Sequence, residues 1–210
     1  MKHLRSSGQL SMLKIHHLLI PVGIVVLAAL TIGVYQANTA PLPEGFPELT
    51  APNQIEVKQY PSYRAATYQT RGELSQAANQ AFSPLYQHIS TNNISMTAPV
   101  ETRYPESTLE GTTSRVAEVS FLYRPREIVP AEIAKNIELQ DIPAMMVVSL
   151  GLKGAYSYES YQQGLKRLSD WLEEHPDYQR VGNPRRFFDD GPYVPDGMKR
   201  SEVQIPIEKR

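Results

Sequence analysis

Glu118-Val119-Ser120-Phe121 and Glu202-Val203-Gln204-Ile205 are two similar stretches of this chain, and their similarity indicates how the chain folds. In each stretch polar and apolar residues alternate, which is typical of a β-strand with one buried face. Each stretch also closes a longer series of elements that occurs twice. The fold therefore follows from a duplicated unit.

Each copy of the unit reads as strand, helix, strand, strand. The first strand-like run ends in a basic residue and a glycine, Arg71-Gly72 in one copy and Lys153-Gly154 in the other. One helix and three strands are too few to bury a core alone. We therefore expect an α+β domain in which both copies share one curled, mixed or antiparallel sheet, with both helices on one face. The predicted ranges are 63–70, 73–89, 96–104 and 116–123, then 144–152, 158–174, 178–188 and 200–207.

The alternation also predicts what the two faces of this sheet carry. Glu118 and Glu202 should line the concavity between the copies, whereas the apolar residues between them should meet the helices. This apolar set is Val119, Phe121, Tyr123, Val203, Ile205 and Ile207.

Pro84 conflicts with the first helical pattern, because a proline inside a helix removes one backbone hydrogen bond. Two outcomes are compatible with the sequence. Either the helix kinks just before Pro84, or a new helix starts at Ser83 with the proline in its first turn.

The N-terminal segment predicts a membrane anchor. Residues 18–35 carry no charge, and this run is just long enough to span a bilayer. Basic residues precede it, but none follows before Lys58, so the positive-inside rule places the N-terminus in the cytoplasm and the domain on the outer side. A cleaved signal peptide is the alternative, although its candidate sites lack a small residue at position −3. The predicted divisions are a cytoplasmic N-terminus (1–17), a transmembrane helix (18–35), a proline-rich extended tether (36–53) and a folded domain (54–210).

Composition excludes several classes of function. The chain has a net charge of −1, and it shows no basic stripe of the kind that nucleic-acid binding requires. It contains no cysteine, which rules out disulfides, thiolate metal sites and cysteine nucleophiles. Hydrolase, P-loop and dinucleotide motifs are missing from the sequence, so we expect no catalytic residues and a protein that is not an enzyme.

A few residues in the domain could still carry chemistry. His88 borders the apolar face of the first helix, where it could cap the helix end or serve as a weak axial ligand to iron. His175 should cap the second helix, and Asp189-Asp190 reads as a turn. Met96 could fill the core or line a ligand site. Glu118 and Glu202 occupy equivalent strand positions and could attract a cationic ligand.

The segment Ile94-Ser95-Met96-Thr97-Ala98-Pro99-Val100, together with the preceding helix, resembles the signature of the SOUL haem-binding family. The resemblance extends over residues 55–207. It implies a distorted, barrel-like sheet with two helices, and a haem or porphyrin ligand in an apolar cleft beside the first helix. The cleft residues it implies are Phe82, Leu85, Tyr86, Ile89 and Met96, with Arg71 or Arg103 for the propionates and His88 as the axial candidate.

The C-terminal part is also similar to the gyrase-inhibitor-like effector-binding domains, on Gly191-Pro192-Tyr193 and on residues 199–207. This resemblance implies a different site, the groove between the two copies. There Glu202, with Tyr193 and Glu118, would face a small cationic or aromatic ligand. Some members of that wider group are hydrolases, which the resemblance leaves as an alternative to binding.

The sequence therefore predicts a tetrapyrrole carrier or buffer, tethered to a membrane through its N-terminal helix and without a nucleic-acid partner. Two alternatives remain: an effector-binding or hydrolytic groove built on Glu202, and an interaction module with no small ligand.

Overall fold

The structure is a computed structural model that describes residues 40–104 and 116–210. The predicted transmembrane helix, residues 18–35, lies outside the described residues. Within the described ranges, no helix combines the length and apolar character needed to cross a bilayer.

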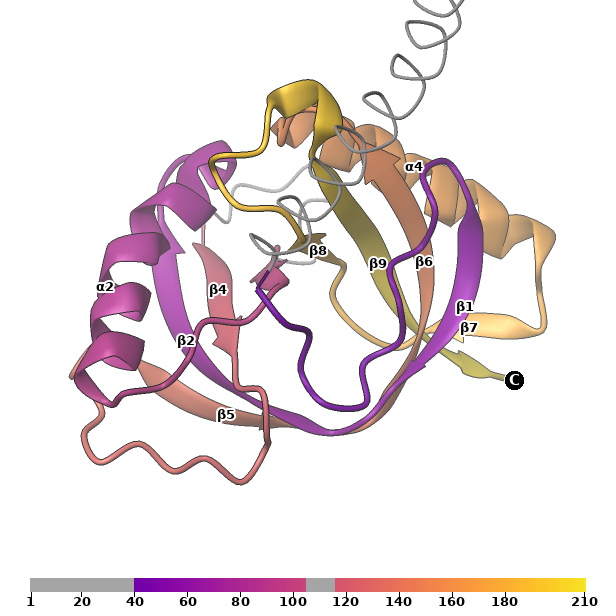
Figure 1. The fold of residues 1–210 in the computed structure, drawn as a ribbon. Helices are drawn as coiled ribbons and strands as arrows, with labels where there is room; N and C mark the ends of the chain where they lie inside the picture. The colour runs from indigo at the N-terminus through magenta and orange to yellow at the C-terminus, as the bar shows by residue number, and fades with distance from the viewer. Residues whose placement is uncertain (1–39, 105–115) are drawn as a thin grey trace, which may run out of the picture. The chain divides into compact units, whose positions relative to one another are not determined.

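The described residues form one antiparallel sheet that curls around a concave face, with two helices on its outer, convex side (Figure 1). Neighbouring strands follow the order β1-β6-β9-β8-β3-β4-β2-β5, and β7 also pairs with β9. The strands are β1 (Ile55–Tyr60), β2 (Tyr63–Arg71), β3 (Val100–Arg103), β4 (Val116–Leu122), β5 (Glu138–Ile142), β6 (Met145–Lys153), β7 (Tyr178–Arg180), β8 (Arg185–Phe188) and β9 (Arg200–Lys209).

The duplicated unit is visible in the pairing of the strands. In the first copy the order is β2-β4-β3, and in the second it is β6-β9-β8. The equivalent strands β3 and β8 pair with each other, with Val100 opposite Phe188, and so join the copies into one sheet. This arrangement confirms the predicted α+β fold with a curled, barrel-like sheet, and it shows that the sheet is antiparallel throughout its described pairs.

The two copies also exchange a strand. β1 precedes β2 in the sequence but pairs with β6 of the second copy, while β5 precedes β6 but pairs with β2 of the first. Only two residues, Pro61 and Ser62, separate β1 from β2, so the chain passes from one half of the sheet to the other at this point. Each half therefore depends on the other for an edge strand.

Two helices cover the convex face. Helix α2 (Ala77–Thr91) follows the short 3-10 turn η1 (Leu74–Gln76) and contacts β2 and β4. Helix α4 (Tyr158–Glu174) is capped by Ser157, whose side chain accepts a hydrogen bond from the Ser160 amide, and it contacts β6 and β9. Pro84 lies inside α2, so no new helix starts there. A second 3-10 turn, η2 (Asp196–Met198), precedes β9.

The predicted apolar face of the sheet packs against these helices. Val119, Phe121, Val203, Ile205 and Ile207 are all buried in one core cluster. The same cluster contains the inner faces of both helices, namely Ala77, Ala81, Leu85 and Ile89 of α2 and Tyr161, Leu165 and Leu168 of α4. The apolar residues that alternate along the strands thus pack against the apolar residues that recur every 3.6 positions along the helices.

Three predicted elements differ from the structure for local reasons. The strand predicted over residues 96–104 begins only at Val100, because Pro99 has no amide hydrogen to donate to a ladder. The strand predicted over residues 178–188 splits into β7 and β8, since Gly182 and Pro184 interrupt it. The helix predicted over residues 73–89 begins at Ala77, after the 3-10 turn.

Residues 40–54 have no regular helix or strand, as their prolines predict, but they do not form a free tether. Pro43 and Thr50 are buried, and the backbone of Asn53 and Gln54 exchanges hydrogen bonds with Gly151 of β6. The segment crosses the inside of the curled sheet (Figure 1, indigo). The prediction of an extended tether over residues 36–53 is therefore wrong for its described part, because apolar side chains between the prolines pack against the sheet.

Candidate functional site

A buried carboxylate, Glu101, lies at the centre of the concave face. Its side chain accepts hydrogen bonds from Arg103 Nε at 2.8 Å, from Arg185 Nη1 at 3.2 Å and from the Tyr63 hydroxyl at 2.9 Å. Glu101 and Arg185 are at most 1% exposed. Burial alone would raise the pKa of Glu101, but the two guanidinium groups outweigh burial and hold this pKa below its usual value. Glu101 is therefore an ionised structural partner.

Glu202 is a second buried carboxylate on the same face. Lys58 Nζ donates to it at 2.7 Å, Ser149 Oγ donates at 3.1 Å, and the Thr50 amide and Gln204 side chain also donate. Burial opposes ionisation, yet the ammonium group of Lys58 and these hydrogen bonds keep the pKa of Glu202 below its usual value. The sequence placed Glu202 on the concave face, and that placement is confirmed.

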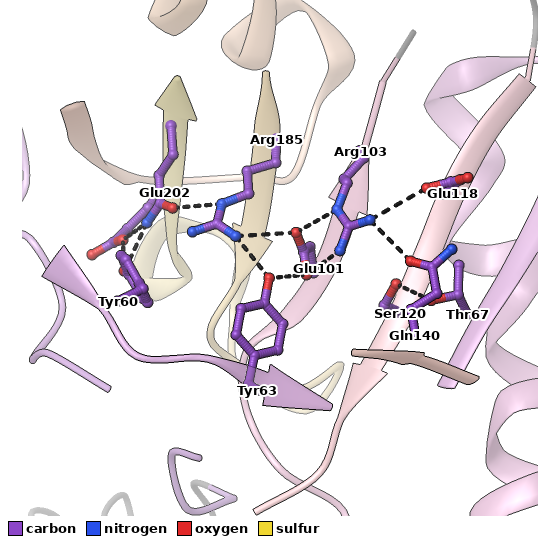
Figure 2. A network of polar contacts seen from close by, with 11 residues as sticks. Tyr60, Tyr63, Thr67, Glu101, Arg103, Glu118, Ser120, Gln140, Arg185 and Glu202 are labelled. Atoms are coloured by element: carbon purple, nitrogen blue, oxygen red, sulfur yellow. Dashed lines mark hydrogen bonds and ion pairs between the residues drawn. The ribbon is translucent and has the colours of Figure 1, made fainter. Parts of the chain in front are cut away.

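The two carboxylates belong to one chain of polar contacts. Arg185 joins them. Its Nη1 donates to Glu101, and its Nε donates at 2.8 Å to Oε1 of Gln204, whose amide nitrogen in turn donates to Glu202 (Figure 2). At the other end Arg103 reaches Glu118 at 3.4 Å and Gln140 at 3.0 Å. Such a network is stable in a buried site only because nearly every member has partners.

The ligand groove predicted from Glu118, Tyr193 and Glu202 is not assembled. Glu118 and Glu202 lie at opposite ends of the polar network, with Arg103, Glu101 and Arg185 between them (Figure 2). Tyr193 is 85% exposed on the loop before β9, and none of its described contacts reaches either carboxylate. The reason is geometric, since equivalent positions in the two copies are separated by the β3–β8 junction.

The N-terminal segment covers the Glu202 end of the concave face. The Phe46 ring packs edge-on against Tyr60 and Tyr63, with centroids 5.0 and 5.2 Å apart, and it stacks on Phe187 at 6.3 Å. Lys58 Nζ also donates to the carbonyl of Glu48 at 2.6 Å. The chain itself thus occupies the place where the sequence predicted a small ligand.

Asp189 is the exception among the carboxylates of this face. It is 3% exposed, and neither of its carboxylate oxygens has a hydrogen-bond partner within the described chain. Burial, together with the nearby charge of Glu202, raises its pKa well above the usual value, which disfavours its charged form. The sequence predicted that Asp189 lies in a turn. It did not predict that Asp189 is buried, which follows from its position directly after β8.

On the convex side, helix α2 exposes two aromatic rings. Phe82 and Tyr86 are 45% and 53% exposed, and they stack with ring centroids 5.9 Å apart, one helical turn from each other. Phe82 also packs edge-on against Phe121 at 5.5 Å. Leu85 and Ile89, predicted as cleft residues, are instead buried beneath these rings in the core. Their side chains pack under the surface and are not accessible to a ligand.

His88 is buried below the same helix. Its Nε2 lies 2.8 Å from the Tyr123 hydroxyl, and the residue is 3% exposed. Burial lowers the pKa of His88, so the ring is neutral near neutral pH. His175 is also engaged, because it stacks on Trp171 at 3.8 Å and its Nδ1 lies 2.7 Å from the Trp171 carbonyl. His88 is thus buried and His175 is half-buried, and no cluster of potential metal ligands occurs within residues 40–104 and 116–210.

A cavity of about 480 Å³ opens at the C-terminal end of α2. Met96, predicted as a ligand-site residue, lines it, and so does Arg124, which supplies a positive charge. Thr97 holds the Met96 segment in place by donating a hydrogen bond to the carbonyl of Leu122 at the end of β4. The full lining is Pro41, Asn92, Asn93, Ile94, Ser95, Met96, Arg124, Pro125 and Ile128. Its volume falls within the range of small-molecule sites.

The two arginines predicted for this cleft lie elsewhere. Arg71 ends β2 at the far end of that strand from the cavity, since it pairs with Val116 whereas Ala65 pairs with Leu122. Arg103 is on the concave face, where Glu101 and Glu118 bind it. Both predictions followed the sequence order of the family pattern, which does not reveal the end or the face of a strand on which a side chain lies.

Sequence reasoning missed the loop between β4 and β5, which contributes three of the nine residues that line the cavity, Arg124, Pro125 and Ile128. Asn92 fastens this loop to the end of α2 by hydrogen bonds to the backbone amide and carbonyl of Glu132, both at 2.9 Å. The loop exposes Val129 (76%) and Ile133 (52%). Large apolar residues in a proline-flanked loop were the available signal, because exposed apolar side chains near a cavity indicate a binding surface.

Comparisons with known proteins agree with this architecture. Among solved structures, the C-terminal domain of EcmrR is 22% identical, with a TM-score of 0.58 over 75% of this chain and 98% of that one. EcmrR in a complex with DNA gives a TM-score of 0.62 at the same identity, and this chain spans 58% of that longer protein. A hydrolase from Listeria innocua is 10% identical, with a TM-score of 0.55 over 76% of this chain and 94% of that one. At these identities the likeness is one of fold.

No curated protein matches the sequence. A family model does match it: the model described as SOUL heme-binding protein covers residues 46–206, which includes both copies of the duplicated unit and the Met96–Val100 segment. The chain therefore belongs to the SOUL haem-binding protein family.

Proposed function

We propose that this protein binds haem or a free porphyrin, without catalysis, at the cavity beside the C-terminal end of α2. One observation carries the proposal: an open, largely apolar cavity of about 480 Å³ bordered by a single arginine and by exposed apolar side chains. Family membership supports the same ligand class. The stacked, half-exposed rings of Phe82 and Tyr86 add aromatic surface on the same helix.

The residues present fit a tetrapyrrole held by its ring and not by its iron. Ile94, Met96 and Ile128 offer apolar contact, and Arg124 can pair with a propionate. Burying about 200 Å² of apolar ligand surface would contribute roughly 5 kcal/mol at about 25 cal/mol per Å². Bound iron would supply redox or ligand-exchange chemistry, whereas His88 would have to leave Tyr123 before it could reach a metal.

Non-catalytic binding also fits the concave face. Glu101 and Glu202 are ionised, buried and saturated with partners, which is unsuitable for a general acid or base that must exchange protons with a substrate. A cationic ligand in that groove would require Lys58 and Thr50 to release Glu202 and Phe46 to leave its aromatic neighbours. The cavity at α2 needs no such rearrangement.

The test is a titration of the full-length chain with hemin and with metal-free protoporphyrin, followed by absorbance. We expect both to saturate at one equivalent with affinities within a few-fold of each other, because apolar burial does not depend on the metal. Ile128→Asp places a charge in the cavity wall and should weaken both ligands by about tenfold or more. Val181→Asp, at an exposed site away from the cavity, is the matched control. Equal binding by both variants would rule out this cavity.

We further propose that the protein is tethered to a membrane through residues 18–35, with the domain on the outer side. The support is the uncharged run itself and the basic residues that precede it. A reporter fused after Arg210 that is active only outside the cytoplasm should be active. Activity of a cytoplasm-specific reporter at the same position would contradict the proposed topology.

A further inference from the structure

A second cavity, of about 220 Å³, lies beside the N-terminal half of α4 and has a strongly basic lining. Three of its residues are cationic, Lys153, Arg167 and Arg186, and none is acidic. This is unusual in a chain with a net charge of −1. The uncharged lining residues are Asn53, Leu152, Gly154, Ala155, Ser160, Gln163, Gly164 and Ser201.

Arg186 is the feature of this cavity that most needs explanation. It is 1% exposed, yet no carboxylate of the described residues forms an ion pair with it. Its Nη1 donates to the Ser157 carbonyl at 2.6 Å, and its Nη2 donates to the hydroxyls of Ser160 and Ser201 at 3.2 and 3.1 Å. Its Nε has no partner. A buried cation left without a counter-charge is costly.

The adjacent residue on β8 provides an internal comparison. Arg185 is equally buried, points to the concave face and is paired with Glu101 at 3.2 Å. Arg186 points to the opposite face, where the rings of Phe188 and Tyr156 lie 4.9 and 5.6 Å from its guanidinium carbon. These rings hold the guanidinium plane but carry no net charge. Asp189 is within electrostatic range of Arg186 but makes no ion pair with it, and burial raises the pKa of Asp189 and so disfavours its charged form.

The start of α4 adds to the positive potential of the cavity. Ser157 caps the helix, and Ser160 and Gln163 of its first turns line the cavity. The Ser160 amide is bonded to Ser157, but the positive end of the helix dipole still favours anions nearby. Lys153 and Arg167 are exposed at the rim, where no described carboxylate pairs with them. Backbone dipole and side-chain charges therefore act in the same direction.

We propose that this cavity binds a multiply charged oxyanion, namely inorganic phosphate or the phosphate group of a small molecule, with Arg186 at its base and Lys153 and Arg167 at its rim. Three separated cations suit a tetrahedral anion with several charged oxygens better than a single carboxylate. The cavity also exceeds by far the roughly 10–15 Å³ that one water requires. The site is independent of the tetrapyrrole cavity, which lies at the end of α2.

The experiment measures binding of inorganic phosphate to the full-length chain by calorimetry, at constant ionic strength maintained with sodium chloride. The wild-type chain should bind one phosphate saturably, and the double variant Lys153→Ala/Arg167→Ala should bind it at least about tenfold more weakly. Lys166→Ala is the matched control, because Lys166 is an exposed cation on the same helix that faces Asp170 instead of the cavity.

Two results would overturn the proposal: no saturable phosphate binding by the wild-type chain, or equal binding by the rim variant and the Lys166 control. The rim side chains are exposed, so the outcome does not depend on a variant of Arg186 that could fail to fold. Hemin titration of the same proteins separates the two sites, since the rim variant should bind hemin as the wild type does.

Discussion

The concave face of the sheet and the surface at the end of α2 differ in how many of their side chains have partners within the protein. On the concave face, charged side chains from distant strands neutralise one another, and residues 43–50 lie over them. At the end of α2, apolar side chains and Arg124 remain open to solvent around a cavity. The charged residues of the concave face therefore stabilise the fold. The apolar side chains around the cavity are incompletely packed, and this surface is the one suited to a ligand.

The largest expected effect would come from breaking the concave network at its centre. Glu101→Ala leaves Arg185 and Arg103 without their buried carboxylate, and we expect it to lower the free energy of unfolding by about 3–5 kcal/mol. Urea denaturation measures this loss. Glu56→Ala, at an exposed position on β1, should change stability by less than about 0.5 kcal/mol. Similar losses of stability in both variants would mean that the buried network does not stabilise the concave face.

Removing the cover of the concave face should have a smaller effect. Phe46→Ala deletes ring contacts with Tyr60, Tyr63 and Phe187, and its half-buried position suggests a loss of about 2 kcal/mol. Hydrogen exchange of the Thr50 amide should also accelerate, because this amide donates to Glu202 under the cover. An unchanged exchange rate would show that the segment is held without Phe46.

A pH-dependent effect is expected at Asp189. Its folded pKa is raised above the ordinary value of 3.8, so wild-type stability is penalised progressively as pH rises above about 4. Asp189→Asn removes the ionisable group. The variant should become more stable than the wild type by about 1 kcal/mol near pH 7, with little difference below pH 4. Asp177→Asn, at an exposed site, should lie within about 0.5 kcal/mol of the wild type. A variant that loses stability relative to the wild type as pH rises would contradict a raised pKa of Asp189.

The smallest expected effect concerns the open surface. Arg124→Ala should weaken hemin binding by only about two- to five-fold, because an exposed ion pair with a propionate contributes less than about 1 kcal/mol. The loss should diminish at high salt. Arg126→Ala is the control, since Arg126 is exposed two residues away and contacts Ser62. A hundred-fold loss on Arg124→Ala would mean that charge, and not ring burial, dominates recognition.

Much of the architecture was predictable from the sequence, and the errors in the predicted boundaries of helices and strands have local causes. Helix α4 matches its predicted range because a serine cap, a strong 3.6-residue pattern and a terminal proline all agree. The site was less predictable. Phe82, Tyr86 and Met96 are at accessible or cavity-lining positions, but Leu85 and Ile89 are core residues, and Arg124 and Ile128 come from a loop that the pattern did not single out.

Spacing along local stretches of the chain was enough to predict the duplicated unit, the buried faces of the two strands that close its copies, and the segment typical of the SOUL family. Three other features emerge only in the folded chain: β1 and β5 exchange between the copies, Lys58 binds Glu202, and Arg185 has a carboxylate partner whereas Arg186 has none among the described residues. These outcomes depend on the register between strands far apart in the sequence, which no local periodicity specifies.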